Sequence, residues 1–112
     1  MKKPNCLYED FSKLDIRVGE VKEAILVESS KKLISLMVDM GEDYGVVEIM
    51  TGMQEWYGPE DFKGKKFLFL ANLEPKPMMG RTSNGMIMAT DIDGKPILNT
   101  VSDDLPNGTM VR

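Results

Sequence analysis

The 112-residue sequence predicts an all-β fold with little helix. Short stretches rich in β-branched and aromatic residues recur along the chain, and turn signals separate them roughly every 8–12 residues. The length suits one modest hydrophobic core, so a single domain over residues 1–112 is expected. These observations together favour a small antiparallel barrel or sandwich.

The first half of the chain contains the clearest expected elements. Residues 8–14 are expected to form one helical turn, too short to be stable unless it docks on the body. Residues 16–27 form a long predicted strand whose apolar phase slips at Gly19, which suggests a bulge or sharp bend there. A strand over 33–40 presents alternate apolar residues on one face, and a hairpin loop at 41–45 leads to a returning strand, 46–50.

The second half alternates between polar connections and apolar runs. Pro59 begins a short helical turn, and residues 65–71 form a buried central strand. A polar connection rich in Pro and Gly, 71–86, leads to a strand over 86–90, and Asp93–Gly94 is a two-residue hairpin turn. Beyond Pro96 the pattern weakens, with a turn at 106–108 before a final short strand. This set of strands suits a five-stranded OB-type Greek-key barrel.

The composition excludes several classes of function. The sequence has no histidine, which removes Ser/His and Cys/His catalysis and His-ligated metals. The one cysteine, Cys6, cannot form an intramolecular disulfide, which favours a reducing, cytoplasmic setting. No apolar run is long enough for a membrane span, and no signal-peptide pattern follows the basic N-terminus. The net charge of −4 argues against nucleic acid, although binding depends on local patches.

Catalytic and metal chemistry find little support in the motifs. The acidic pairs are consistent with metal ligands or a general acid–base couple, but they fit turn chemistry better; they are Glu9/Asp10, Asp91/Asp93 and Asp103/Asp104. The glycines form no phosphate-binding loop pattern. No combination of nucleophile, base and orienting residue is present, so we expect no enzyme, metal or cofactor.

A second group of residues is suited to binding. Cationic side chains and neutral donors occur in connections that flank one face of the predicted barrel: Lys31, Lys32, Asn72, Lys76, Arg81, Ser83 and Asn84. Trp56 and Tyr57 are candidate stacking platforms, and Met78 and Met79 could form an adaptable apolar surface. Taken singly, each of these residues also fits an ordinary surface or core role.

Four segments in order carry a family resemblance. They are Asp10–Gly19 (DFSKLDIRVG), Lys32–Gly41 (KLISLMVDMG), Thr51–Met53 with the following Tyr57, Pro59–Glu60 and Gly64–Lys65, and Ala71–Met86 (ANLEPKPMMGRTSNGM). They resemble the tRNA-binding domain family of OB-fold proteins. That family includes the C-terminal domain of many methionyl-tRNA synthetases, EMAP-II-like cytokine domains, stand-alone tRNA-binding proteins and a small secretion chaperone.

The resemblance implies a non-catalytic protein that recognises tRNA by its shape and backbone. The matching family positions are Lys32, Asn72, Lys76, Ser83 and Met86, with Arg17 and Gly52 shaping the same region. In this interpretation the two lysines neutralise phosphates, Asn72 and Ser83 donate hydrogen bonds, and Met86 packs under a base or holds the loop. Arg81 adds a charge and Asn84 a supporting donor.

The resemblance also implies partners and an alternative. It implies a homodimer, with the interface expected at the N-terminal turn and in the segment after Pro96, and assistance to methionyl-tRNA synthetase in trans. Three positions where the family commonly has Lys or Arg are occupied here by Glu74, Pro77 and Met79. We therefore expect weaker tRNA binding than in a strongly basic member of the family. The alternative is the chaperone branch, whose apolar groove holds extended polypeptide and would suit Met78, Met79 and Trp56.

Overall fold

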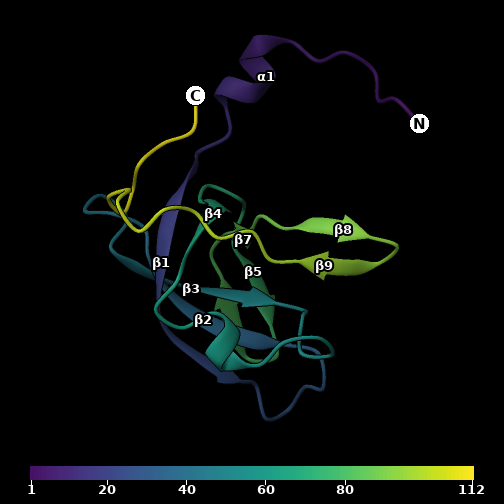
Figure 1. Ribbon diagram of the computed structural model, residues 1–112, viewed down its shortest axis with the longest axis vertical. Helices are drawn as coiled ribbons and strands as arrows, with labels where there is room; N and C mark the ends of the chain where they lie inside the picture. Colours follow the sequence, from purple (N-terminus) through teal and green to yellow (C-terminus); the bar gives the residue numbers. More distant parts are fainter.

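A five-stranded antiparallel sheet curls into a nearly closed barrel in the computed structural model, which describes the whole chain, Met1–Arg112 (Figure 1). In spatial order the strands are β3 (Val46–Thr51), β2 (Ile34–Asp39), β1 (Ile16–Leu26), β4 (Lys66–Leu70) and β7 (Met86–Ile87). The backbone N–H of Asn84 donates to the carbonyl of Glu48 (2.8 Å) and brings the start of β7 against β3. The predicted five-stranded barrel is therefore confirmed.

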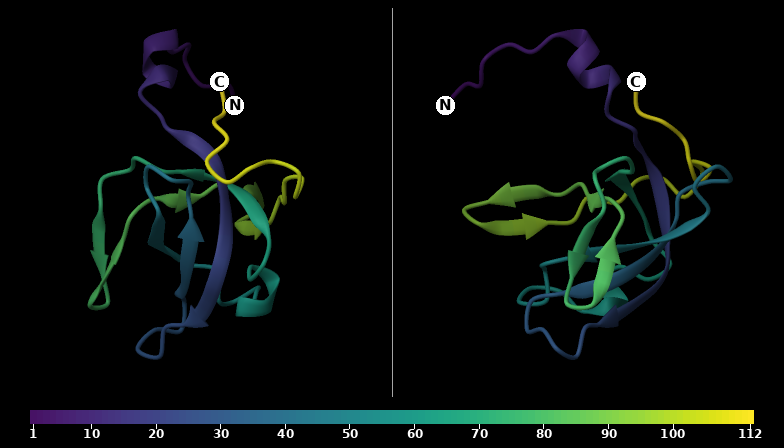
Figure 2. Two further views of the ribbon diagram at one scale, coloured as in Figure 1. Left: turned by 90° about the vertical axis from the view of Figure 1, so that its left-hand side faces the viewer. Right: turned by 180° about the vertical axis from the view of Figure 1, so that it is seen from behind.

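The remaining elements are short and lie outside this sheet. They are α1 (Tyr8–Ser12), the 3₁₀ turn η1 (Pro59–Asp61), and two hairpins, β5 (Lys76–Met78) with β6 (Arg81–Ser83) and β8 (Thr90–Ile92) with β9 (Lys95–Ile97). Figure 2 shows β5–β6 standing beside the barrel and β8–β9 projecting from it as an arm. None of the helices is long and apolar enough to cross a membrane.

The barrel interior follows the alternation read from the sequence. On β2, Ile34, Leu36 and Val38 all point inward and are fully buried. Three phenylalanines share this interior: the ring centroids of Phe62 and Phe67 lie 6.0 Å apart, and those of Phe67 and Phe69 lie 6.4 Å apart. Phe62 follows η1, so the predicted turn at Pro59 places an aromatic side chain in the core.

Strand β1 belongs to both halves of the barrel. Ile16–Glu20 pairs with β4 and Glu20–Leu26 pairs with β2. Of the two alternatives expected at Gly19, a bulge or a sharp bend, the bulge is wrong in position, since the register shift lies between Val21 and Glu23. Gly19 is instead a site of close packing, where an added Cβ would lie 2.6–2.8 Å from side chains of β2, β4 and Met40.

Three further expectations need correction. Helix α1 does not dock on the body; none of its residues is buried, and it stands away from the barrel (Figure 1). The strand expected over 86–90 ends at Ile87, and Thr90 already begins the arm. No final strand forms after the turn at 106–108, because only one residue pair, Arg17 with Met110, bridges the C-terminal segment to β1.

The connection over 71–86 contains a hairpin that the sequence interpretation missed. Met79 and Gly80 form its turn, both with positive φ (50° and 78°), which matches the twist of a two-residue hairpin turn. The sequence did not indicate this hairpin, because three residues per strand are too few to show an alternating pattern. Prolines at 75 and 77 also argue against a strand.

Gly19→Ala should overpack the barrel. The new methyl group would press on Val38 and on the ring of Phe69, so we expect the free energy of unfolding to fall by about 1–3 kcal/mol. Urea denaturation followed by circular dichroism would measure it. Gly52→Ala is the matched control, because an added Cβ there meets nothing within 4 Å. Equal stability of the two variants would contradict the packing argument.

Candidate functional site

The β5–β6 hairpin is fixed to the outer surface of the barrel by three contacts. Arg81 forms an ion pair with Glu48 of β3 (2.7 Å). The Ser83 hydroxyl accepts the backbone N–H of Met50 (3.0 Å) and donates to the carbonyl of Gly85 (3.2 Å). Met78 packs against a small apolar cluster that contains Met50. The hairpin is therefore a supported element on which side chains can be positioned.

The ion pair on the hairpin affects the charge state of Glu48. Burial opposes ionisation of this carboxyl, but hydrogen bonds from the Ser35 hydroxyl and the Arg81 guanidinium more than offset it, so the pKa of Glu48 lies below its ordinary value. Glu48 stays ionised and keeps Arg81 engaged. The positive charge of Arg81 is thus partly neutralised within the protein.

The hairpin brings several of the predicted residues into one hollow, which we call the Lys76 hollow. Its volume is about 180 Å³, and Lys76, Ser83 and Met86 line it together with Met50, Leu73, Glu74, Met78 and Gly85. Lys76 is exposed and forms no ion pair, and Glu74 lines the same hollow. The hollow is therefore mixed in charge, with one free ammonium group.

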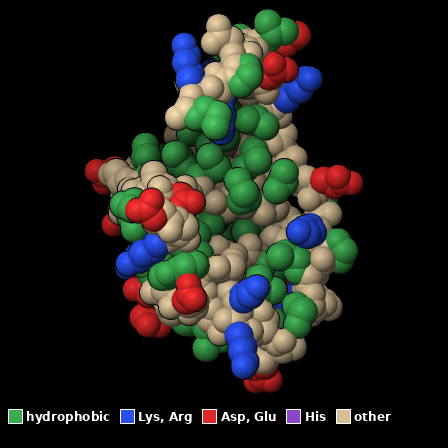
Figure 3. Space-filling model, turned by 90° about the vertical axis from the view of Figure 1, so that its right-hand side faces the viewer, with side chains coloured by type: hydrophobic (Ala, Val, Ile, Leu, Met, Phe, Trp, Pro, Cys, Tyr) green, Lys and Arg blue, Asp and Glu red, His purple; other side chains and the backbone are tan.

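A second and larger hollow adjoins the first at Met86, and we call it the Trp56 groove. It has a volume of about 450 Å³ and lies between the end of β3, the turn that follows it and the base of the β8–β9 arm. Its lining includes Gly52, Trp56, Met86, Met88 and Pro96. Figure 3 shows a band of hydrophobic side chains on this side of the molecule, with Lys and Arg side chains near its lower part.

Lys32 lies on a segment that is hydrogen-bonded to the turn beside the Trp56 groove. Its carbonyl accepts the backbone N–H of Gln54 (3.1 Å), in the turn that carries Trp56, and its side chain is exposed and forms no ion pair. Lys32 and Lys76 are thus two unpaired cations on segments that border the hollows. Whether they contact a ligand stays a prediction.

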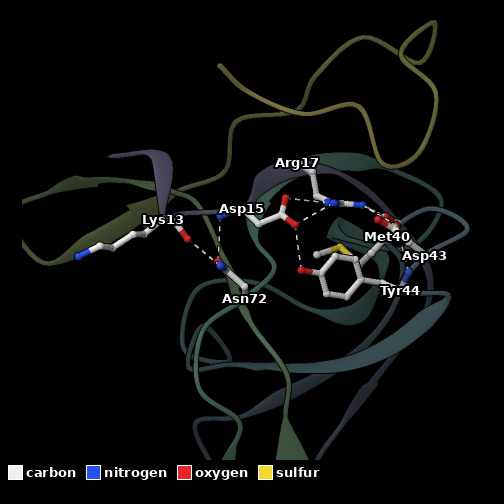
Figure 4. Close-up of polar contacts among 7 residues, drawn as sticks. All are labelled: Lys13, Asp15, Arg17, Met40, Asp43, Tyr44 and Asn72. Atoms are coloured by element: carbon white, nitrogen blue, oxygen red, sulfur yellow. Dashed lines mark hydrogen bonds and ion pairs between the residues drawn. The ribbon is translucent and has the colours of Figure 1, made fainter. Parts of the chain in front are cut away.

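Arg17 and Asn72 lie elsewhere, in a polar cluster at the start of β1 (Figure 4), which we call the Arg17 network: Asp15, Arg17, Asp43, Tyr44 and Asn72. Arg17 is buried and forms ion pairs with Asp15 (2.7 Å) and Asp43 (2.8 Å), and its guanidinium lies 4.5 Å from the centre of the Tyr44 ring. The guanidinium donates two hydrogen bonds to Asp15, one to Asp43 and a fourth to the carbonyl of Met40 (3.2 Å). This guanidinium has little capacity left for a ligand.

Asn72 is also committed to the fold. Its side-chain carbonyl accepts the backbone N–H of Asp15 (2.8 Å), and its amide donates to the carbonyl of Lys13 (2.7 Å). It therefore ties the chain after β4 to the segment that leads from α1 into β1. Asn84 acts in the same way, donating to the carbonyls of Glu48 and Thr82 (both 3.3 Å). The roles of Asn72 and Ser83 as donors to a ligand remain predictions, and both side chains already have protein partners.

The aromatic candidates divide in the structure. Tyr57 packs edge-on against Phe62 and donates its hydroxyl to the carbonyl of Pro96 (2.8 Å), so it is partly buried against the core. Trp56 remains 38% exposed. The acidic pairs behave as turn residues where they are engaged, since Asp91 accepts the N–H of Gly94 and Asp10 that of Leu7.

Comparison with known proteins agrees with this architecture. Residues 16–110 match the family model described as "Putative tRNA binding domain". The chain belongs to this family. It is 47% identical over 103 residues to a methionine–tRNA ligase of Archaeoglobus fulgidus, a match that covers 92% of this chain but only 15% of the ligase. A methionine–tRNA ligase of Clostridium acetobutylicum is 41% identical over 112 residues, and this match also covers only a small share of the ligase, 17%.

Solved structures related to this tRNA-binding domain family member match almost end to end. A MetRS-related protein of Pyrococcus horikoshii has 36% identity and a TM-score of 0.92, covering 98% of this chain and all of that one. The chaperone CsaA of Bacillus anthracis has 29% identity and a TM-score of 0.84, covering 97% and 100%. The predicted resemblance is therefore confirmed, including both of its branches.

Asp15→Asn should make the domain less stable and less sensitive to acid. Hydrogen bonding from Arg17 holds the pKa of the Asp15 carboxyl below its ordinary value of 3.8. Because the folded-state pKa is depressed, this stabilisation is present above about pH 4 and is lost as the pH falls through the folded-state pKa. At pH 7 we expect a loss of about 1–3 kcal/mol in the free energy of unfolding, from breaking a charged hydrogen bond to a buried partner.

The measurement is urea denaturation of wild type and Asp15→Asn at pH 7 and at about pH 3, with Asp104→Asn as the control for removal of an exposed carboxyl that forms no ion pair. The gap between wild type and Asp15→Asn should narrow in acid. A gap that stays constant would show that Asp15 contributes through packing and not through its charge.

Proposed function

We propose that this chain is a non-catalytic tRNA-binding protein that contacts the tRNA backbone with Lys32 and Lys76 and works beside methionyl-tRNA synthetase in trans. Membership of the tRNA-binding domain family carries the proposal. The two unpaired lysines support it, because each can neutralise a phosphate without first breaking an internal ion pair. The likeness to the MetRS-related protein supports the link to that synthetase. A cytoplasmic location is part of the proposal.

The charge balance fits modest affinity. Arg81 is shared with Glu48, and Glu74 lies on the Lys76 hollow, so few free positive charges face a ligand. Each neutralised phosphate adds to both affinity and salt dependence. Binding through so few cations is expected to be strongest at low ionic strength.

The double variant Lys32→Ala/Lys76→Ala tests this proposal. Filter retention of tRNA at several salt concentrations should show weaker binding, and the slope of log affinity against log salt should fall by about one unit for each lysine that contacts a phosphate. Lys22→Ala/Lys63→Ala is the matched control, because it removes the same charge from side chains paired with Glu20 and Glu23. Equal loss in both variants, or none in either, would refute the assignment.

Binding of unfolded polypeptide is the second candidate function. The observation that favours it is the hydrophobic band of Figure 3, together with likeness to the CsaA chaperones of Bacillus anthracis and Picrophilus torridus. Titration of tRNA and of an unfolded peptide at two salt concentrations separates the candidates. Salt-sensitive binding of tRNA supports the first, and salt-insensitive binding of peptide supports the second.

We also propose that the chain forms a homodimer through α1 and the C-terminal segment. Tyr8 and Leu14 are 79% and 45% exposed, and Leu14 borders a hollow lined by Met110 and Val111. No residue of helix α1 is fully buried within one copy, and a five-residue helix is unstable alone, so a second copy would supply the missing contacts.

Tyr8→Glu/Leu14→Glu should convert the dimer to a monomer, because two carboxylates in an apolar interface cannot be solvated. Light scattering should show the mass fall by half. Ile92→Glu is the control; it alters an apolar side chain of intermediate exposure (62%, between Leu14 and Tyr8) at the β8–β9 arm and should leave the mass unchanged. A monomeric wild type would contradict the proposal.

A further inference from the structure

The backbone of Trp56 is anchored beside an open groove. The backbone N–H groups of Trp56 and Tyr57 both donate to the carbonyl of Met53 (3.0 Å each), and Met53 is buried in the core. The Tyr57 hydroxyl then ties the same turn to Pro96 at the base of the arm (2.8 Å). The turn is therefore anchored on both sides, and its one exposed aromatic side chain lines the Trp56 groove.

The groove offers flat and polarisable surfaces but no positive charge. Apolar lining comes from Trp56, Met86, Met88 and Pro96, and the only charged lining residue is Asp91. A carboxylate repels phosphate, so the groove does not suit the backbone of a nucleic acid. An uncharged aromatic ring suits it, because indole and thioether groups both pack favourably on ring faces.

The Trp56 groove and the Lys76 hollow offer neighbouring places for the uncharged base and the charged phosphate of a nucleotide. Met86 lines both the Trp56 groove and the Lys76 hollow, so the two lie on either side of one residue. Lys76 lines the neighbouring hollow, Lys32 lies on the segment bonded to the turn of Trp56, and the groove supplies a stacking surface. Proteins that bind single-stranded nucleic acid on small barrels combine cations that follow the backbone with aromatic side chains that stack on bases.

We propose that the Trp56 groove takes one unpaired nucleobase of the bound RNA, stacked on the Trp56 indole, while Lys76 or Lys32 contacts the adjoining phosphate. This inference rests on the proposed tRNA binding and adds a base contact to it. Stacking is tolerant of base identity, since every base has a π-face, so the groove requires an unpaired nucleotide and not a particular sequence.

The test uses the fact that Trp56 is the only tryptophan, so all tryptophan fluorescence comes from the proposed site. Titration with a single-stranded oligoadenylate of four nucleotides should quench the fluorescence of the full-length wild type. In filter retention, Trp56→Ala should weaken tRNA binding about tenfold, whereas Trp56→Phe should keep most of the affinity because it retains a ring. The salt slope should stay unchanged in both variants, since no phosphate contact is removed.

Val46→Ala is the matched control, because it truncates an exposed apolar side chain (54%) outside the groove and should leave tRNA binding intact. Urea denaturation of each variant separates loss of binding from loss of folding.

If Trp56→Ala binds tRNA like wild type while Lys32→Ala/Lys76→Ala does not, the base site is refuted and tRNA binding stands. Absence of tRNA binding by wild type at low salt overturns both. Fluorescence quenching by an unfolded peptide and not by oligoadenylate assigns the groove to polypeptide and overturns the base site.

Discussion

The double pairing of β1 is the constraint on which the rest of the structure depends. This strand pairs with β4 along its first half and with β2 along its second, and on its inner side there is no room for a side chain at Gly19. Both ends of this strand also carry other parts of the molecule. Arg17, near its start, holds the β2–β3 hairpin loop through Asp43. Val27, just after its end, belongs to the apolar cluster that receives Met78.

The candidate site therefore depends on elements that are not part of the binding surface. The β5–β6 hairpin keeps its place because Glu48 on β3 retains Arg81, and because Ser83 satisfies a backbone N–H of the same strand. Sites built on supported strands hold their side chains more closely than sites on free loops. The consequence is a division of roles, in which Arg81 and Ser83 hold the surface and Lys76 is left free to act on it.

Local patterns predicted the barrel well, because alternation on β2 and turn residues such as Asp93–Gly94 act through near neighbours in the chain. The Arg17 network could not be read in this way, since its partners come from three separate segments that only the folded barrel brings together. For the same reason Asn72 looked like a free donor. Its position after a strand was visible in the sequence, but its two backbone partners before β1 were not.

The groove had a partial signal in the sequence. Trp56 stood out as a candidate for stacking, but its neighbour Tyr57 carried the same signal, and only burial distinguishes them. The arm that forms the far side of the groove was recognised as a hairpin, yet nothing in its residues indicates which way it projects. Orientation of a hairpin relative to a barrel is set by packing at its base, which sequence periodicity does not report.

The bridge between Arg17 and Met110 has a consequence for how this domain combines with others. Val111 donates its backbone N–H to Ile16 (2.8 Å), so the chain enters and leaves the barrel side by side at one end. A domain with adjacent ends can be joined to another protein at either side, or placed between two segments, without opening its sheet. The same unit can then function as one module among several, which fits its recurrence as about 15% of much longer ligases.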